Sequence, residues 1–415
     1  MENSSTEFDF VDNGGVTSPL GFRACGITAG LKRSGKPDFA LVASDSDCSA
    51  AGTFTSNLFP AAPVRLCRER IAAGLPVRAV VAHSGVANAC TGEQGYRDAC
   101  LTAKEAAKCL EVPETAVLVT STGRIGVQLP MEKVILPGVR KAVAALARDG
   151  GSAASEAIMT TDTRPKQVAV RFRVNGKTVT IGGMTKGAGM ISPRMLVCRP
   201  HATMLCYLTT DAAVSKEDLA AFLTDGVDVS FNRISVDNDM STNDTCLLLA
   251  NGASGVAIHA GTPEGEAFLA ALTMVMQHLA KAMVLDGEGA SKFITVEVRG
   301  AATTDDAEKC ARAIADSMLC KTAWFGNDPN WGRVLAAAGY SGATFSPENV
   351  SLDYDEMPVV RGGMDAGTPE PKLCEVVKRR SFRVLIDLGE GVRSAIRWTS
   401  DLTHDYVTIN ADYHT

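Results

Sequence analysis

A tight hairpin near the middle of the chain most limits the folds that this sequence can adopt. Residues 167–174 alternate apolar and polar side chains, and residues 177–181 continue the pattern after Asn175-Gly176. Asn-Gly between two such runs is the strongest short signal for a two-residue β-turn, because both positions of that turn need a positive φ. The chain therefore contains antiparallel strands, and a sheet made only of parallel strands joined by helices is excluded.

Short apolar runs and helical patterns alternate along the rest of the chain, which predicts a mixed α/β fold. Ser215 opens a capping box, Leu219 and Phe222 share one face of the helix that follows, and Gly226 is expected to end it. No internal repeat and no clear linker is present, and residues 362–371 are expected to form a surface loop. The expected strands span residues 79–81, 116–120, 293–298 and 381–388, and the expected helices span residues 97–110, 134–147 (stopping at Gly150-Gly151), 262–283 and 305–319.

Composition places the chain among globular proteins and narrows its partners. Its 415 residues are 46% hydrophobic and 21% charged with a formal net charge of −6, so we expect a buried core and no binding to nucleic acid. Residues 1–18 lack the basic and apolar segments of a signal peptide, and polar side chains interrupt the apolar stretch 267–285. We therefore expect a cytoplasmic protein without a membrane span, whose 12 cysteines stay reduced.

The common catalytic signatures are absent from the sequence. It contains no Gly-x-Ser-x-Gly elbow, no Walker loop, no Gly-x-Gly-x-x-Gly opening a helix, and no His-Glu-x-x-His or Cys-x-x-Cys pair. Its 6 histidines show no spacing typical of metal ligands. We expect neither a metal nor an organic cofactor.

Threonine-rich and glycine-rich turns stand instead at the ends of apolar runs. Taken singly, each is most simply a strand end or a turn, since Thr suits strands and Gly supplies turns. Together they indicate a site that uses a hydroxyl group and backbone N–H groups in place of histidine or metal. The turns are Ser-Thr-Gly-Arg at 121–124, Met-Thr-Thr-Asp-Thr at 159–163, Lys-Gly-Ala-Gly at 186–189, His-Ala-Thr-Met-Leu at 201–205 and Asp-Gly-Glu-Gly at 286–289.

Thr203 is the hydroxyl that its neighbours equip best for nucleophilic attack. A threonine hydroxyl needs a base, and cleavage of the chain just before it would supply one as the new α-amine. The ordinary pKa of such an amine, about 7.7–8.0, suits proton transfer near neutral pH. The small Ala202 leaves room for Thr203 to attack the preceding carbonyl, and the apolar residues 204–208 would carry Thr203 at the end of a buried strand.

Further motifs extend the pattern over nearly the whole chain. They are Gly21-Phe22 with Gly26, Phe-Pro-Ala-Ala-Pro-Val at 59–64, Ser-Gly-Val-Ala-Asn-Ala-Cys-Thr-Gly at 84–92, Gly-Asn-Asp-Pro-Asn-Trp-Gly-Arg at 326–333, and Asp-Tyr-Val-Thr-Ile-Asn-Ala-Asp-Tyr at 405–413. In content and in order, this set of motifs resembles the bifunctional ornithine acetyltransferase / glutamate N-acetyltransferase family of arginine biosynthesis.

The resemblance implies a fold and a reaction. The fold would be a mixed α/β (α+β) layered sandwich related to N-terminal-nucleophile hydrolases. Self-cleavage would give chains 1–202 and 203–415, which stay intertwined and pair into a heterotetramer with two chains of each kind. In a ping-pong reaction, Thr203 would take the acetyl group of N-acetylornithine, ornithine would leave, and glutamate would collect the acetyl group. A bifunctional member would also accept acetyl-CoA as donor.

The same resemblance implies roles for single residues. Thr122 and Gly123 would form the oxyanion hole, and the cut would fall between Ala202 and Thr203. Lys186 would meet a carboxylate and Glu288 an amino group, although a solvated loop lysine and an ordinary turn acid are the simpler alternatives. The motif at 326–333 is expected to be a structural turn with a packed tryptophan. The expected substrate contacts are Thr160, Lys186, Thr203, Glu288, Asn410 and Thr415.

Two departures from the family pattern accompany these expectations. His83 and Val86 stand where the family usually has asparagine, so two amide side chains are lost near the predicted site. Residues 196–201 resemble an insertion directly before Ala202. Other functions stay open: an amidohydrolase or aminopeptidase of the same architecture, an acetyltransferase of a secondary pathway, and an uncleaved relative that only binds amino acids.

Overall fold

The computed structural model describes residues 7–192 and 204–412 of the chain, and the chain divides into two compact units. Unit 1 comprises Met1–Asn232 and Met240–Met283, and unit 2 comprises Arg233–Asp239 and Val284–His414. Both units mix helices and strands, which confirms the α/β class predicted from the sequence.

Unit 1 holds nine strands that are joined through one long strand, β3, which belongs to two sheets. The first half of β3 pairs with β2 and β4, and β4 pairs in parallel with β5. The second half pairs with β11 at the edge of the order β1-β6-β7-β8-β11-β3. The strands are β1 (Phe8–Phe10), β2 (Phe22–Ile27), β3 (Phe39–Phe54), β4 (Val77–Val86), β5 (Val117–Arg124), β6 (Lys166–Val174), β7 (Lys177–Lys186), β8 (Leu205–Thr210) and β11 (Thr245–Ala250), beside the short pair β9 (Ala213–Val214) and β12 (Ala257–Ile258).

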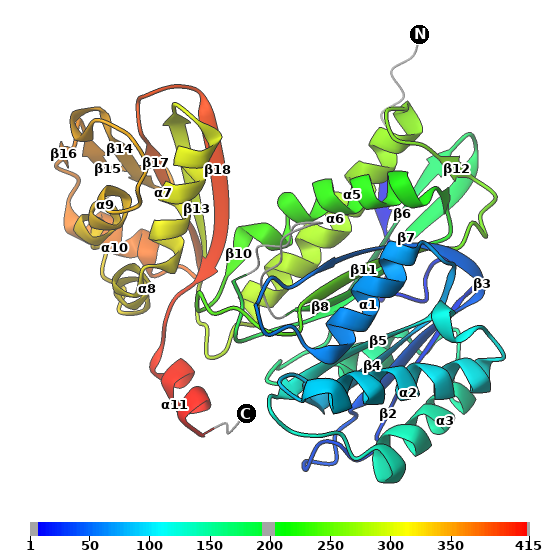
Figure 1. Ribbon diagram of the computed structural model, residues 1–415. Coiled ribbons are helices and arrows are strands. Elements are labelled where there is room, and N and C mark those ends of the chain that lie inside the picture. Colours follow the sequence, from blue (N-terminus) through cyan, green and yellow to red (C-terminus); the bar gives the residue numbers. More distant parts are fainter. Residues whose placement is uncertain (1–6, 193–203, 413–415) are drawn as a thin grey trace. The chain divides into compact units, whose positions relative to one another are not determined.

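Helices cover the outer faces of the two sheets, so unit 1 has the layered architecture that the sequence predicts (Figure 1). The outer helices are α2 (Gly92–Leu110) and α3 (Leu136–Ala144) on one side, and α5 (Lys216–Asp228) and α6 (Pro263–Leu285) on the other. The core between the sheets contains Tyr207 and Leu247 from one sheet and Val80 and Leu118 from the other. Two helices, α1 (Ala62–Ala73) and α4 (Gly151–Ala157), contribute Val64 and Ala154 to this same core.

The helix α6 is long and apolar enough to cross a membrane by length and composition, yet half of its most apolar window is buried inside the protein. Val275, Met276 and Leu279 are fully buried. Gly183 of β7 faces this helix, because a Cβ atom there would lie 2.9 Å from a methyl carbon of Leu279. In this structure α6 is therefore a core helix of unit 1.

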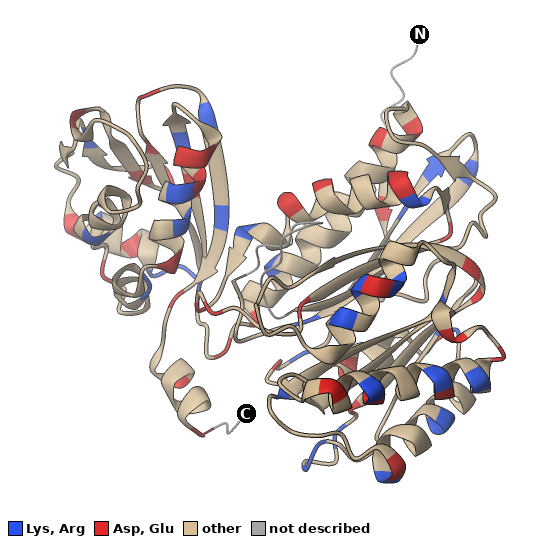
Figure 2. Cartoon of the chain, in the orientation of Figure 1, with Lys and Arg blue, Asp and Glu red and all other residues tan. Residues whose placement is uncertain are grey.

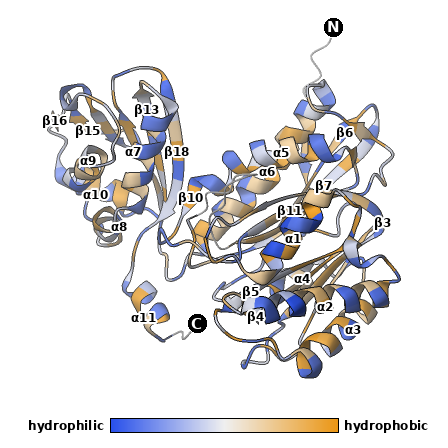
Figure 3. Ribbon diagram, in the orientation of Figure 1, coloured by the Kyte–Doolittle hydropathy of each residue, from blue (hydrophilic) through white to orange (hydrophobic). Residues whose placement is uncertain are grey.

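Unit 2 is a seven-stranded sheet packed against helices. The strands run in the order β10-β18-β13-β17-β14-β15-β16. The core of unit 2 includes Val296 and Val298 of β13 and Ala311 and Ile314 of α7, a helix that Figure 3 shows with both hydrophobic and hydrophilic residues. Trp331 packs against this core, which agrees with the structural role predicted for its motif. The elements are β10 (Ile234–Ser235), β13 (Phe293–Ala301), α7 (Thr304–Asp316), α8 (Met318–Phe325), α9 (Trp331–Gly339), β14 (Ser351–Tyr354), β15 (Met357–Arg361), β16 (Met364–Asp365), α10 (Glu370–Val377), β17 (Ser381–Asp387), β18 (Arg393–Ser400) and α11 (His404–Asp412).

Two local predictions are confirmed in detail. Strands β6 and β7 form the expected hairpin, with Asn175 at φ 50° and Gly176 at φ 79°. The Ser215 hydroxyl accepts the backbone N–H of Asp218 at 3.1 Å and so caps α5.

Other predicted element ends are wrong, and tertiary contacts explain the differences. Gly226 does not end α5, which continues to Asp228; the glycine is needed because a Cβ there would lie 2.6 Å from the sulfur of Met276. The helix predicted over 134–147 ends at Ala144, and Gly151 begins α4. Residues 362–371 contain β16 and the start of α10 in place of a plain loop.

Candidate active site

The Ser-Thr-Gly segment at 121–123 lies at the end of β5 in unit 1. It is called the oxyanion turn below, after the role that the sequence motif predicts for it. The strand continues past its predicted end because β4 pairs with it in parallel, with Ser84 opposite Thr122 and Gly85 opposite Gly123. Gly123 has φ 124°, and a Cβ there would lie 2.3 Å from the Gly85 carbonyl carbon. Only glycine fits, because any side chain at this position would meet the Gly85 backbone.

Lys186 joins the oxyanion turn to the strand that follows the predicted nucleophile. It is the last residue of β7 and pairs with Leu205, the first residue of β8. Its Nζ lies 3.4 Å from the hydroxyl oxygen of Thr122, and it is only 3% exposed. The neighbouring Thr185 hydroxyl donates to the Leu205 carbonyl at 2.9 Å. The structure thus brings together the end of β5, the end of β7 and the start of β8.

Asp162 connects the predicted Thr160 turn to the same place. Its carboxylate accepts the Thr160 N–H at 3.0 Å, the Gly187 N–H at 2.7 Å and the Lys166 ammonium at 2.6 Å. Burial raises the pKa of Asp162, but Lys166 and Lys186 outweigh that effect and hold it at about 2. Figure 2 shows that charged residues of unit 1 otherwise gather on the outer helices, while the strands are largely uncharged. Asp162 and Lys166 thus form a buried ion pair beside this charge-poor sheet.

Asn243 holds the backbone of the oxyanion turn by hydrogen bonds, and the sequence did not indicate this role. Its side-chain amide donates to the Ala87 carbonyl at 2.7 Å and to the Ser121 carbonyl at 2.8 Å. The hydroxyls of Thr120 and Tyr207 also meet at 2.6 Å, which ties β5 to β8 across the core. The sequence signal at Asn243 was a run of polar residues just before the apolar strand β11. Such a run does not indicate which distant residues its side chains will contact.

Two further buried polar groups lie near the site. No hydrogen bond of normal geometry reaches either carboxyl oxygen of Asp244 from the described residues. Burial raises the pKa of Asp244 well above its ordinary value, against the opposing effects of the Met204 N–H and Lys186. His83, the departure noted in the sequence, stacks on Phe39 with ring centres 6.4 Å apart, and burial lowers its pKa to about 4.

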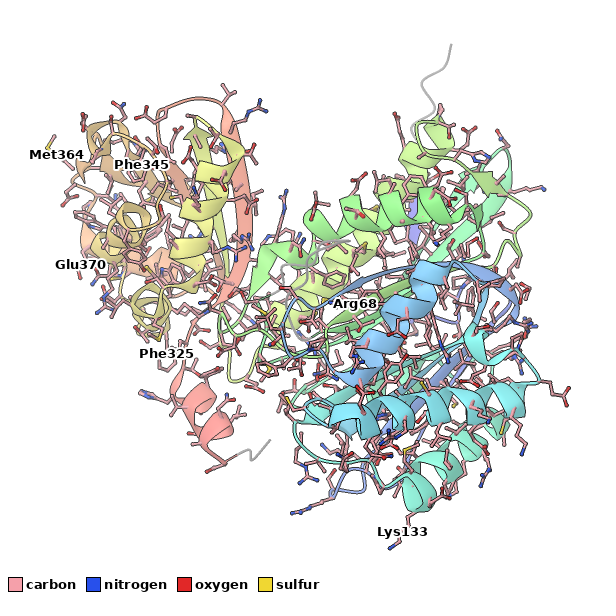
Figure 4. The ribbon with its side chains drawn as sticks, in the orientation of Figure 1. Arg68, Lys133, Phe325, Phe345, Met364 and Glu370 are labelled. Carbon is pink, nitrogen blue, oxygen red and sulfur yellow. The ribbon has the colours of Figure 1, made fainter. Side chains whose placement is uncertain are left out.

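In unit 2, Glu288 and Asn410 contact each other as predicted partners of one site. The Asn410 amide donates to a carboxylate oxygen of Glu288 at 2.7 Å. Asn410 belongs to α11, which Thr403 holds by donating to the Gly289 carbonyl at 2.8 Å. The ring of Phe325, labelled in Figure 4, packs edge-on against His404 at the start of α11 with centres 5.4 Å apart. Glu288 is 9% exposed, whereas Asn410 is exposed.

Three predicted residues lie outside the described residues: Ala202, Thr203 and Thr415. The expected division into chains 1–202 and 203–415 is therefore still a prediction. Within residues 7–192 and 204–412, no group of three or more His, Cys, Asp or Glu side chains gathers as metal ligands. Arg68 of α1, labelled in Figure 4, donates to the Thr55 carbonyl and covers the Phe54 ring at 5.9 Å. We interpret Arg68 as structural.

Comparisons with known proteins assign the family. The model of the ArgJ family matches residues 23–415. The arginine biosynthesis bifunctional protein ArgJ of Symbiobacterium thermophilum is 51% identical over 97% of this chain and 99% of its own length. The chain belongs to the ArgJ family. It is an acetyltransferase of arginine biosynthesis, as the sequence motifs predicted.

Two more proteins are similar to this chain. Glutamate N-acetyltransferase of Methanocaldococcus jannaschii is 47% identical over 98% of this chain and 100% of its own length. A solved structure of ornithine acetyltransferase from Mycobacterium tuberculosis, complexed with ornithine, is 44% identical; it covers 46% of this chain and 100% of its own, with a TM-score of 0.43.

Proposed function

We propose that this ArgJ-family enzyme moves the acetyl group of N-acetylornithine to glutamate through an acetyl ester on Thr203. The observation that carries the proposal is the meeting of Lys186, Thr122 and Leu205 in unit 1. Thr203 precedes Leu205, the first residue of β8, by two residues in the sequence.

In the proposed first half-reaction, the Thr203 hydroxyl attacks the acetyl carbonyl and the α-amine of the same residue takes its proton. The carbonyl oxygen becomes negative, and donors from Thr122 and Gly123 stabilise it; one such donor is typically worth about 3–4 kcal/mol. The C–N bond then breaks and ornithine leaves with the proton. In the second half-reaction the glutamate amine attacks the ester, forms the new amide and returns the hydroxyl to Thr203.

We propose the substrate contacts as the motifs predicted them. In unit 1 these are Thr160 and Lys186, whose surroundings around Asp162 supply positive charge for a carboxylate. In unit 2 they are Glu288 and Asn410, a carboxylate and an amide suited to an amino-acid amine. Thr415 is the remaining proposed contact.

Processing and assembly complete the proposal. The chain would cut itself between Ala202 and Thr203, and the products would form a heterotetramer with two chains of each kind. Exposed apolar side chains such as Leu58, at 94%, would be covered in such an assembly. The proposed location is the cytoplasm, where free thiols such as the described cysteines stay reduced. Acetyl-CoA is proposed as a second donor.

An N-acetylornithine assay with and without glutamate tests the function. We expect ornithine release that depends on glutamate, with N-acetylglutamate formed in equal amount. Acetate in place of N-acetylglutamate would identify an amidohydrolase, and no turnover from a single uncut chain would identify a binding protein without catalysis. Replacing N-acetylornithine by acetyl-CoA in the same assay decides whether the enzyme has both activities.

A further inference from the structure

Three segments of unit 2 meet at one edge of its sheet. Strands β10 and β18 run parallel, with Ser235 paired with Thr399, so the residues that follow the two strands leave the sheet at the same edge. Strand β13 runs antiparallel to β18 with Phe293 opposite Ser400, so the residues that precede β13 lie at this edge as well. The three segments are residues 236–239, residues 286–292 and the helix α11.

The buried carboxylate of Asp401 ties the second segment to the end of β18. It accepts the backbone N–H groups of Ser291 and Lys292, both at 2.9 Å, and also the Ser291 hydroxyl. Glu288 precedes Ser291 by three residues, and α11 begins three residues after Asp401. The backbone that carries Glu288 is therefore held beside the chain that leads into α11.

The helix α11 depends on contacts with the rest of unit 2, because none of its nine residues is buried and so short a helix has little stability of its own in water. Gly289 permits one close contact: it has φ 66°, and a Cβ atom there would lie 2.7 Å from the Tyr406 nitrogen. The Thr403 hydroxyl, which donates to the Gly289 carbonyl, accepts the Tyr406 N–H at 3.3 Å.

Tyr406 uses all three of its polar groups to place this helix. Besides its N–H, its hydroxyl donates to a carboxylate oxygen of Asp237 at 3.3 Å, and its carbonyl accepts from the Asn410 amide at 3.0 Å. The same amide nitrogen donates to Glu288 at 2.7 Å. Both partners are acceptors, so the nitrogen of the Asn410 amide must face them, and both of its N–H groups are used.

This orientation leaves two kinds of acceptor for a ligand. Within residues 7–192 and 204–412, no hydrogen bond uses the side-chain oxygen of Asn410, and Glu288 has acceptor capacity left. An alkyl-ammonium group carries three N–H donors, which a carboxylate and an amide oxygen side by side can accept.

We propose that Tyr406 is a positioning residue of the amine site. Held by Asp237, it turns the Asn410 amide so that the amide oxygen, beside the Glu288 carboxylate, receives an alkyl-ammonium group of the substrate. The inference rests on the proposed function, in which this group is the free amine of N-acetylornithine.

Kinetics of full-length variants test the role of the Tyr406 hydroxyl. Tyr406→Phe removes the hydroxyl and keeps the ring, and Tyr340→Phe, at an exposed tyrosine of unit 2, is the matched control. We expect Tyr406→Phe to lower kcat/KM for N-acetylornithine about tenfold, the effect of losing a hydrogen bond to a charged group. The kcat/KM for glutamate, which has no side-chain amine, should stay within about twofold, and Tyr340→Phe should match wild type.

A double-mutant cycle separates positioning from a general structural role. If Tyr406 acts through Asn410, the variant Tyr406→Phe/Asn410→Ala should have the kcat/KM of Asn410→Ala alone, within about twofold. Asp237→Ala should reproduce the loss in Tyr406→Phe, whereas Asp237→Asn keeps an acceptor oxygen and should recover most of the activity. Losses that multiply in the double variant, or wild-type kinetics in Tyr406→Phe, would overturn the inference.

Hydrogen exchange distinguishes a failure of the proposed function from a failure of this inference. A wild type without turnover of N-acetylornithine would refute the function, and ornithine would then serve as the amine probe. We expect ornithine to slow amide exchange in residues 404–412 of wild type, and Tyr406→Phe to need about tenfold more ornithine for the same slowing. Equal responses in the two proteins, or no response in either, would contradict the role of Tyr406.

Discussion

Two buried carboxylates of this protein, Asp162 in unit 1 and Glu288 in unit 2, come from predicted motifs but have different hydrogen-bond partners. Asp162 accepts two backbone N–H groups and a lysine ammonium, and it and Lys166 are almost fully buried. Glu288 accepts the amide of Asn410, which lies on an exposed helix. Asp162 has three donors within the fold, whereas Glu288 accepts from the amide of the exposed Asn410 and has acceptor capacity left. The comparison shows that a residue predicted from a motif can either hold neighbouring backbone in place or keep acceptor capacity for a ligand.

The largest expected effect on stability comes from replacing Asp162. Asp162→Asn removes the charge that compensates Lys166 and Lys186, and a buried ion left without its partner costs about 3–5 kcal/mol of unfolding free energy. Urea unfolding of the two proteins at pH 7 measures the difference.

The pH dependence checks the cause of that loss. The pKa of Asp162 is about 2 in the folded protein, below its ordinary value of about 3.9. The stabilisation from its charge is therefore complete above pH 4 and disappears as the pH falls through 2. The gap between wild type and Asp162→Asn should narrow over that range, and a constant gap would mean that shape, not charge, explains the loss.

His83 is expected to give the next largest effect on stability, and here the charged form is the protonated one. Its folded pKa of about 4 lies below the ordinary 6.5, because burial disfavours the charged ring. The unfolded chain binds a proton first as the pH falls, so stability is complete above pH 6.5 and decreases toward pH 4, by about 3 kcal/mol. His83→Asn cannot titrate and should lose less stability between pH 7 and 4 by thermal unfolding. The exposed His259→Gln is the control and should follow wild type.

Much of the fold was predictable where the signal was local. The Asn175-Gly176 hairpin and the Ser215 cap follow from backbone preferences of a few residues, and both are confirmed. Gly226 looked like a helix end because glycine often is one, yet here it makes room for the distant Met276 sulfur. Its role depends on a contact between helices, which no short window of sequence contains.

In the candidate site too, residues in local motifs could be predicted and residues that act through distant contacts could not. Thr122 and Lys186 lie in recognisable motifs and the structure brings them to 3.4 Å. Asn243, whose amide donates to the Ser121 carbonyl, and Asp38, whose carboxylate accepts the Lys32 N–H, act on residues far away in the sequence or through backbone groups. Contacts of this kind, in which one residue holds the backbone of another site residue, can be seen only in the three-dimensional structure.

The smallest effect on stability is expected at Glu288. Glu288→Gln keeps an acceptor for Asn410, so the unfolding free energy should change by no more than about 0.5 kcal/mol. Turnover of N-acetylornithine should nevertheless fall strongly, since the proposed contact with an amino group loses its charge. Steady-state kinetics and urea unfolding of the same two proteins measure the two effects. If Glu288→Gln has wild-type kinetics, Glu288 does not contact the substrate.

The central claim is that Thr203 becomes the N-terminal nucleophile, and the mass of the purified chains tests it most directly. The wild-type protein should separate into residues 1–202 and 203–415, and the second chain should begin Thr-Met-Leu-Cys-Tyr on N-terminal sequencing. Thr203→Ala should give one intact chain with no transfer of acetyl, while Thr203→Ser should still cut, more slowly. An intact wild-type chain with full glutamate-dependent transfer, or a second chain that begins elsewhere, would contradict the mechanism.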